Sequence, residues 1–163
     1  MIQLVECVPN ISEGRDGAIV ERIAGAVRET PGCTLLGVES DASHNRSVIT
    51  FIGEPKAVAD GAVALARRAA ELIDLTKHTG EHPRMGAVDV IPFIPIKGIT
   101  MEECVKLSLD VGARIAQEAG MPVFLYERSA SAPHRANLAD IRRGQFEAMA
   151  EKIKNPEWTP DFG

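Results

Sequence analysis

Two apolar, β-branched runs close to each other in the first third of the chain constrain the fold more than any other feature. The first covers residues 33–40 (CTLLGVES) and the second residues 46–53 (RSVITFIG). The stretch between them, Asp-Ala-Ser-His-Asn, is rich in turn formers, so the pattern predicts an antiparallel hairpin. An amphipathic helix is predicted on each side, which places the hairpin between two helical connections.

The flanking helices are predicted from the spacing of apolar residues. Residues 18–30 carry apolar side chains at helical spacing, and Pro-Gly-Cys at 31–33 ends the pattern. A longer helix begins at Pro55, because proline is favoured in a first helical turn. Its apolar stripe consists of Val58, Ala62, Leu65, Ala69 and Leu72. Each helix therefore has one apolar face to bury against a sheet.

Two further strands complete the predicted sheet. They are residues 2–9 (IQLVECVP) and residues 87–96 (AVDVIPFIPI), where Asp89 alternates with valines. Pro92 and Pro95 cannot donate to a ladder, which favours an edge, a bulge or an early exit from the sheet. The order predicts an α/β (α+β) fold with a ferredoxin-like βαββαβ core, in which a mixed sheet carries helices on one face. The length predicts one domain over residues 1–163.

The C-terminal third adds further elements. Thr100-Met101-Glu102-Glu103 is a capping box that begins a helix, and Gly120 supplies the left-handed residue that ends it. Residues 121–127 (MPVFLYE) are expected to form another strand. Asn137 is expected to cap a short helix, and residues 145–153 to form a second one.

Composition excludes several classes of protein. The net charge is −5, and no basic tract with interleaved aromatics occurs, so nucleic acid is not an expected partner. No apolar run approaches the roughly 20 residues that span a membrane. The N-terminus lacks a basic region followed by an apolar core, which favours a cytoplasmic protein. Cys7, Cys33 and Cys104 are widely spaced and are expected to be buried thiols rather than disulfides or metal ligands.

The stretch His-Thr-Gly-Glu-His, residues 78–82, has three possible interpretations. His-x-x-Glu-His is the spacing of an inverted zinc-peptidase motif, which needs both imidazoles on one helix. Gly80 disfavours that helix by about 1 kcal/mol relative to alanine, and Pro83 pushes His82 towards extended geometry. No metal is therefore expected. The remaining interpretations are a metal-free proton-transfer residue at His82, which titrates near pH 6.5 when unperturbed, and a polar turn.

A second polar cluster surrounds the predicted hairpin turn. One interpretation is turn chemistry, for which Asp, Ser and Asn are favoured. The other is ligand binding, in which Arg46 holds a carboxylate through two hydrogen bonds beside Asn45. The cluster consists of Glu39, Asp41, His44, Asn45 and Arg46.

Two more groups of polar residues complete the survey. Asn10, Ser12 and Glu13 follow the first strand and are placed to line the same end of the sheet. Arg67-Arg68 and Arg142-Arg143 are expected on solvated helix faces.

Four stretches together resemble the N-terminal subdomain of the glutamate formiminotransferase family. They are VECVPNISEGRD, PGCTLLGVESDASHNRSVITFIG, HTGEHPRMGAVDVIPFIPIKGITMEECV and PEWTPDFG. The similarity runs from Met1 to Gly163, and the segment GEHPRMGAVDV is its most specific part. The family's sheet with external helices agrees with the fold predicted from the pattern.

The resemblance implies a transferase of histidine degradation. Such an enzyme moves the formimino group from N-formimino-L-glutamate to N5 of tetrahydrofolate, which is a co-substrate rather than a bound cofactor. The family's catalytic histidine, in GEHPRMG, matches His82. N5 loses a proton as it attacks, and the glutamate nitrogen gains one as it leaves. One imidazole acting as general base and then general acid contributes about 10²–10⁴-fold in rate.

The resemblance also suggests binding residues. Arg84, Asn45 and Arg46 are candidates for polar or carboxylate contacts. Glu39 stands where relatives often carry aspartate, so the acid is retained but is one methylene longer. Gly163 lies where the folate-contacting loop of the family begins.

Family enzymes continue into a second subdomain, and their folate site lies between the two halves. This chain is therefore expected to provide His82 and half of the binding cleft, and to need a C-terminal subdomain or a separate chain. A half with an uncovered apolar surface is expected to self-associate, as a dimer or other homo-oligomer. Two alternatives are a stand-alone binding or assembly module without turnover, and a zinc hydrolase.

Overall fold

The computed structural model of the protein describes residues 2–80 and 84–163. In this part of the chain, one sheet is built from β1 (Leu4–Cys7), β2 (Asn10–Ile11), β3 (Thr34–Asp41), β4 (Arg46–Gly53), β5 (Val88–Val90) and β6 (Phe93–Lys97). The long helices are α1 (Gly17–Arg28), α2 (Pro55–Leu72) and α3 (Met101–Ala119). The shorter ones are η1 (Leu75–Lys77), η2 (Glu127–Ser129), η3 (Pro133–Arg135), α4 (Leu138–Arg142), α5 (Gln145–Lys152) and η4 (Pro156–Trp158).

The strand order is that of a ferredoxin-like core. β4 pairs with β3 on one side and with β1 and β2 on the other, and β6 and β5 pair with β1 and β2 in turn. β1 and β2 thus act as one strand interrupted at Val8 and Pro9, and β5 and β6 as one interrupted at Ile91 and Pro92. The expectation of an edge or an early exit at the two prolines is confirmed in the described sheet: Pro92 lies in the interruption, and Pro95 lies in the edge strand β6, where its nitrogen has no donation to make.

The predicted fold class is confirmed, with one difference in the sheet. The pairings between the strands described above are all antiparallel, where a mixed sheet was expected. The reason is topological. β1 and β3 are connected through α1 and run in the same direction, but β4 is inserted between them, so the two parallel strands never pair.

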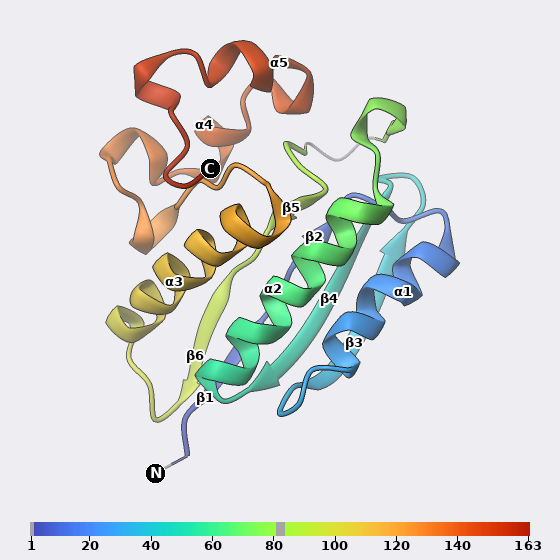
Figure 1. Ribbon diagram of the computed structural model, residues 1–163, viewed down its shortest axis with the longest axis vertical. Coiled ribbons are helices and arrows are strands. Elements are labelled where there is room, and N and C mark those ends of the chain that lie inside the picture. The colour runs from blue at the N-terminus through green and yellow to red at the C-terminus, as the bar shows by residue number, and fades with distance from the viewer. Residues whose placement is uncertain (1, 81–83) are drawn as a thin grey trace.

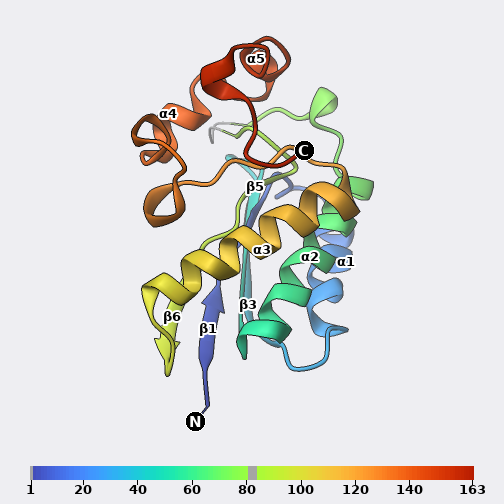
Figure 2. The same ribbon diagram turned by 60° about the vertical axis from the view of Figure 1, so that its left-hand side comes forward.

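The long helices form a layer on one face of the sheet, as predicted (Figures 1 and 2). The core lies between this layer and the sheet. Its fully buried side chains include Val5, Cys7, Ile11, Ile49 and Phe51 from the strands and Ile23, Val27, Val58 and Leu65 from the helices. Among the residues that the structure describes, no helix layer covers the opposite face of the sheet (Figure 2).

That uncovered face carries residues that alternate with the buried ones. Glu6 lies opposite Ile52 on one side and Ile94 on the other, and Glu39 lies opposite Val48. Ile94 is 39% exposed. This face therefore exposes apolar as well as charged side chains to solvent.

Local signals begin and end the helices where the sequence predicts. The Thr100 side chain accepts from the Glu103 amide and the Glu103 side chain accepts from the Thr100 amide, which completes the capping box. Gly120 has φ of 68° at the end of α3, and the Asn137 side chain accepts from the Ala139 amide. Caps of this kind contribute about 1 kcal/mol each to helix stability.

Residues 121–163, the C-terminal segment, differ most from expectation. They pack beyond the end of α3 and beside β5 (Figure 1). Residues 121–127 do not form the predicted strand, because their only ladder contact within the described chain is a single bridge between Val123 and Phe162. An apolar run forms a strand only where a sheet edge is available to receive it.

The C-terminal segment is held together by cations and aromatic rings. The buried Arg135 guanidinium pairs with Asp161 at 3.1 Å and donates to the carbonyl of Thr159 at 2.7 Å. Trp158 lies under the Lys152 ammonium, 4.2 Å from its ring centroid, and contacts the edge of the His134 ring. These contacts fasten the last residues of the chain onto η3 and α5.

The three cysteines are free thiols. Cys7 and Cys104 are buried, as predicted, whereas Cys33 is half-buried. Burial raises the pKa of Cys33 to about 11. Among the helices described, none is both long enough and apolar enough to cross a membrane.

Candidate functional site

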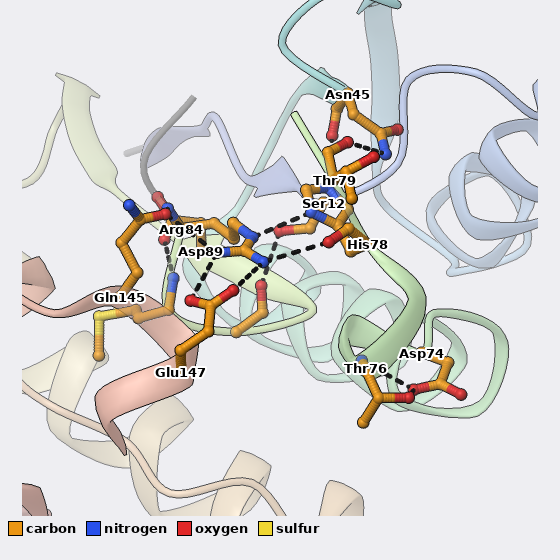
Figure 3. Close-up of polar contacts among 12 residues, drawn as sticks. Ser12, Asn45, Asp74, Thr76, His78, Thr79, Arg84, Asp89, Gln145 and Glu147 are labelled. Carbon is orange, nitrogen blue, oxygen red and sulfur yellow. Dashed lines mark hydrogen bonds and ion pairs between the residues drawn. The ribbon is translucent and has the colours of Figure 1, made fainter. Parts of the chain in front are cut away.

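The segment that contains the predicted catalytic residue connects η1 to β5. His82, with Glu81 and Pro83, lies outside the described residues, so its role stays a prediction. Its flanks, residues 78–80 and 84–87, are described and lie between the β3–β4 turn and the start of α5 (Figure 3). Functional side chains often lie on such connections, where a rigid sheet positions them.

The His78 ring is hydrogen-bonded through both nitrogens. Nε2 donates to the backbone carbonyl of Asn45 at 3.0 Å, and Nδ1 accepts from Nε of Arg84 at 2.9 Å. A guanidinium can only donate, so Nδ1 must carry a lone pair. His78 is therefore a neutral imidazole with its proton on Nε2.

This geometry bears on the zinc interpretation. His78 has φ of −85° and ψ of 132°, and residues 78–80 are not helical, so the helical turn that the motif requires does not begin at His78. A zinc ligand also needs a free lone pair. The lone pair of His78 already faces the permanent positive charge of Arg84. His78 is thus committed to the protein's own hydrogen bonds.

Arg84 is buried and is bound by the protein itself. Its two terminal nitrogens form a two-pronged ion pair with Glu147, at 2.7 Å and 3.0 Å. One of these nitrogens also donates to the Gln145 side chain at 2.9 Å. Hydrogen bonds from Arg84 lower the pKa of Glu147. The predicted contact between Arg84 and a substrate carboxylate stays untested, but a carboxylate of the chain already occupies that place (Figure 3).

The backbone of Arg84 is also held by α5. The Phe146 amide donates to the Arg84 carbonyl at 3.0 Å, and the Arg84 amide contacts Oε1 of Gln145 at 3.4 Å. Gly144 precedes this turn with φ of 86°, a left-handed conformation that favours glycine. The start of α5 therefore fixes both the main chain and the side chain of Arg84.

Asn45 holds residues 78–80, on the N-terminal side of His82. It is buried and has φ of 53°, a left-handed conformation that asparagine tolerates. Its Oδ1 accepts from the Gly14 amide and its Nδ2 donates to the Thr79 carbonyl, each at 2.9 Å. A ligand contact by Asn45 stays a prediction, while the observed amide joins three loops of the protein.

The remaining predicted contacts lie in two different places. Glu39 is exposed on β3, and Arg46 is half-buried at the start of β4, opposite Asp41. Both belong to the hairpin whose turn contains Asn45. Gly163 lies apart from them, against Met121 and Pro122. The structure thus groups Asn45 with the flanks of His82, leaves Glu39 and Arg46 on the adjoining hairpin, and separates Gly163.

The polar hairpin turn also shows the turn chemistry predicted as one interpretation of this cluster. The Asp41 side chain accepts from the His44 amide at 3.1 Å and contacts Nδ1 of the His44 ring at 2.8 Å. These hydrogen bonds lower the pKa of Asp41. The turn is therefore held by hydrogen bonds within the chain itself.

Sequence reasoning missed a buried ion pair behind the site. Asp89 accepts from the Met85 amide at 2.9 Å and pairs with Arg142 of α4. The Asp89 side chain is 2% exposed and that of Arg142 is 20% exposed, so the expectation that Arg142 lies on a solvated face is wrong. An aspartate within an apolar strand was the available signal, because a buried carboxylate requires a partner.

Ser12, which follows β2, holds the stretch that precedes β5 through hydrogen bonds. Its hydroxyl donates to the Gly86 carbonyl at 2.7 Å, and its amide donates to the Ala87 carbonyl at 2.9 Å. The prediction that Ser12 lines this end of the sheet is confirmed. Its observed contacts are with the protein backbone.

A cavity of about 670 Å³ lies between the helix layer and the C-terminal segment. Its lining is mainly apolar and includes Leu72, Val88, Val111, Leu125, Ile141 and Phe146. Its volume is within the range of small-molecule sites. None of the described residues predicted to bind ligand contributes to it.

The antiparallel sheet, its single helix layer and the anchored polar loop define a ferredoxin-like α+β domain with a candidate site on its connections. The chain belongs to the family of the formiminotransferase domain, N-terminal subdomain, which residues 4–163 match. This confirms the family resemblance noted in the sequence.

The relatives show how much of a longer protein the chain represents. It is 52% identical to glutamate formimidoyltransferase of Streptococcus pyogenes serotype M1, covering all of this chain and 54% of the relative. It is 49% identical to that of Thermoplasma acidophilum, again covering 54% of the relative. With formimidoyltransferase-cyclodeaminase of Mus musculus the identity is 53%, over 30% of the relative. The chain thus spans about half the length of the shorter relatives.

Proposed function

We propose that this chain is the half of a glutamate formimidoyltransferase that supplies the proton-transfer residue, His82. The reaction moves the formimino group from N-formimino-L-glutamate to N5 of tetrahydrofolate, in histidine degradation in the cytoplasm. The observation that carries the proposal is the similarity to glutamate formimidoyltransferase along the whole chain, which includes the GEHPRMG segment. The anchored flanks of this segment support it, because a proton shuttle has to be held in place.

The proposed mechanism assigns both proton transfers to one imidazole. His82 takes the proton from N5 of tetrahydrofolate as N5 attacks the amidine carbon, and returns a proton to the departing glutamate nitrogen. Histidine suits this task, because it exchanges protons near neutral pH. His78 does not suit it, because both of its ring nitrogens are already hydrogen-bonded. Tetrahydrofolate acts as a co-substrate, and the proposed steps need no metal.

The substrate contacts are proposed on the uncovered side of the hairpin. Glu39 and Arg46 are the preferred candidates, because they lie on β3 and β4 beside the anchored loop. Arg84 and Asn45 are proposed to act mainly through the protein hydrogen bonds described above. Gly163 is proposed to lead into the folate-contacting segment, as the family resemblance implies.

The uncovered sheet face is proposed to contact the other half of the enzyme, either as a C-terminal subdomain or as a separate chain. The exposed apolar side chains of β3 and β6, Leu36, Ile94 and Ile96, support this proposal. When the partner is absent, the same face is proposed to mediate self-association.

The proposal is tested by reconstitution. The chain is mixed with the remaining half of the Streptococcus pyogenes relative, formiminoglutamate and tetrahydrofolate are supplied, and product absorbance is followed. His82→Ala is expected to lower the rate by at least about 100-fold. The control is His134→Ala, because this ring packs against Trp158 in the C-terminal segment. Full activity of His82→Ala would contradict the assigned role.

The second candidate is a binding or assembly module without turnover, which the use of Arg84 and Asn45 in the protein's own hydrogen bonds favours. Calorimetry with folate and with formiminoglutamate separates the two candidates. Binding without turnover under every pairing would support the module. Stoichiometric zinc in the purified protein would instead support the hydrolase alternative.

A further inference from the structure

We infer that Gln145 and Glu147, in the first turn of α5, are positioning residues for the proposed transfer. They hold Arg84, which follows His82 in the chain, and through Arg84 they hold the ring of His78, which precedes it. This inference rests on the proposed function for its catalytic meaning. Its structural basis is the network of contacts in Figure 3.

The first step is the set of hydrogen bonds that α5 forms with Arg84. Glu147 binds the guanidinium through two hydrogen bonds, Gln145 accepts from it at 2.9 Å, and the Phe146 amide holds the Arg84 carbonyl. A two-pronged pair between guanidinium and carboxylate fixes orientation as well as distance. Arg84 therefore has one arrangement of its donors while Glu147 is charged.

The second step is the consequence for His78. With Glu147 and Gln145 binding the terminal nitrogens, Nε of Arg84 is directed at Nδ1 of His78, and NH2 reaches the His78 carbonyl at 3.3 Å. This fixes the proton of His78 on Nε2, where it donates to Asn45. The start of α5 and the β3–β4 turn are thus joined through one neutral imidazole.

The third step concerns the segment between the anchors. Asn45 holds Thr79, and α5 holds Arg84. His82 is joined covalently to both anchored stretches, two residues from Gly80 and two from Arg84. Because a misplacement of about 1 Å can lower a catalytic rate about 100-fold, anchors of this kind affect chemistry without touching substrate.

The exposure of the Glu147 side chain helps to distinguish a role in positioning Arg84 from a role in stabilising the fold. Its side chain is 65% exposed, whereas that of Arg84 is 8% exposed. An ion pair with one exposed partner usually contributes little to folding stability. Removing Glu147 is therefore expected to lower the stability of the fold modestly and to change the arrangement of Arg84, whose side chain is buried.

The activity test uses the reconstituted enzyme with variants at Glu147. Glu147→Ala is expected to lower kcat about tenfold to 100-fold with little change in KM. Glu147→Asp, which retains the charge, is expected to restore part of the loss. Glu151→Ala is the matched control, because Glu151 lies one turn further along α5 and pairs only with Lys154 in the described structure. A lower KM at unchanged kcat in Glu147→Ala would overturn the inference, since Glu147 would then be blocking a carboxylate site.

A second measurement uses the chain alone and does not depend on activity. The ring nitrogen signals of His78 in NMR spectra report which nitrogen carries the proton. The wild type and Glu151→Ala are expected to show one neutral form protonated on Nε2. Glu147→Ala, and Glu147→Gln if the alanine variant does not fold, are expected to lose this single form.

The two measurements distinguish the possible failures. Identical His78 signals in the Glu147 and Glu151 variants would contradict the anchoring, whatever the activity. An inactive wild-type assembly would contradict the proposed function, and the ring signals would then still decide whether α5 holds His78. Changed ring signals at unchanged kcat and pH profile would show a structural contact without a positioning role.

Discussion

At the scale of single residues, Gly80 shows how closely the site loop approaches the hairpin turn. A Cβ atom on Gly80 would lie 2.4 Å from the His44 carbonyl oxygen and 2.9 Å from Cβ of Asn45. Both neighbours are tightly held, so the loop itself would have to move. Glycine is therefore required here by close contact rather than by an unusual φ.

Gly80→Ala is expected to destabilise the fold by about 1–3 kcal/mol through overpacking. It should also weaken the hydrogen bond between Asn45 and Thr79, because the two backbones separate. Chemical denaturation measures the first effect. Gly37→Ala is the control, because a Cβ there meets no atom within 4 Å. Equal midpoints for the two variants would contradict this reading of the contact.

Glu147 gives a prediction about pH. The Arg84 hydrogen bonds lower the pKa of this carboxyl below its ordinary value of 4.5. A carboxyl whose pKa is lowered by folding stabilises the folded state above pH 4.5, and this contribution is lost as the pH falls through the lower folded value. Glu147→Gln is therefore expected to reduce the unfolding free energy at pH 6 to 7, with the difference from wild type shrinking below pH 4.5.

The measurement is a series of denaturation curves across this pH range. Glu151→Gln serves as the control for loss of a surface charge on the same helix. A difference between wild type and Glu147→Gln that stays constant down to pH 2 would contradict the assigned pair.

At the scale of elements, the buried pair of Asp89 and Arg142 connects the site strand to the C-terminal segment. Asp89 is on β5 and Arg142 ends α4. Arg142→Met is expected to lower the unfolding free energy by about 3–5 kcal/mol, because it leaves a buried carboxylate without its partner. Calorimetric melting tests this expectation.

Two further variants make that test specific. Asp89→Asn combined with Arg142→Met should be less destabilised than Arg142→Met alone, because no unpaired charge remains. Arg143→Met should have little effect, since its side chain is 79% exposed. Equal losses for the Arg142 and Arg143 variants would contradict the importance of the pair.

The elements that the sequence predicts correctly are those determined locally. Apolar spacing, Pro55 and the Thr100–Glu103 box all act within a few residues, and α2 and α3 begin where they indicate. The strand expected at residues 121–127 is not formed, because a strand depends on a distant edge that its own residues do not encode. The antiparallel pairing likewise follows from where β4 inserts.

The candidate site likewise contains one part that the sequence predicts and another part that it does not. The resemblance leads to residues 78–84, and Gly80 and Pro83 correctly argue against a helix at 78–80. The partners of the site could not be found, because they are distant in the chain. Arg84 lies 63 residues from Glu147, and Asn45 lies 34 from Thr79. A polar side chain can bind a ligand or form hydrogen bonds within the protein. Which of the two it does depends on the groups that the fold brings next to it, and these cannot be identified from the sequence alone.

At the scale of the whole molecule, we expect the uncovered sheet face to mediate self-association of the chain and its binding to the second half of the enzyme. Ile94 lies opposite Glu6 on this face. Ile94→Lys is expected to shift the chain towards monomer and to weaken its binding to the second half, because a charge would be buried in the interface. Analytical ultracentrifugation over a wide concentration range measures the first effect and calorimetric titration the second.

Leu109→Lys is the control for this experiment, because Leu109 is 41% exposed but lies on α3, within the helix layer. A wild type that stays monomeric at all concentrations would contradict self-association through this face. Equal effects of the two substitutions would show that the binding surface lies elsewhere.

The placement of Trp158 has a practical consequence for every spectroscopic study of this molecule. It is the one tryptophan of the sequence, and Tyr126 is the one tyrosine. Both lie in the C-terminal segment and outside the ferredoxin-like core. Intrinsic fluorescence will therefore report the loss of the contacts that Trp158 makes with His134 and Lys152. It will be largely insensitive to unfolding of the sheet. Far-ultraviolet circular dichroism has to be recorded beside it before a single transition is taken to mean cooperative unfolding.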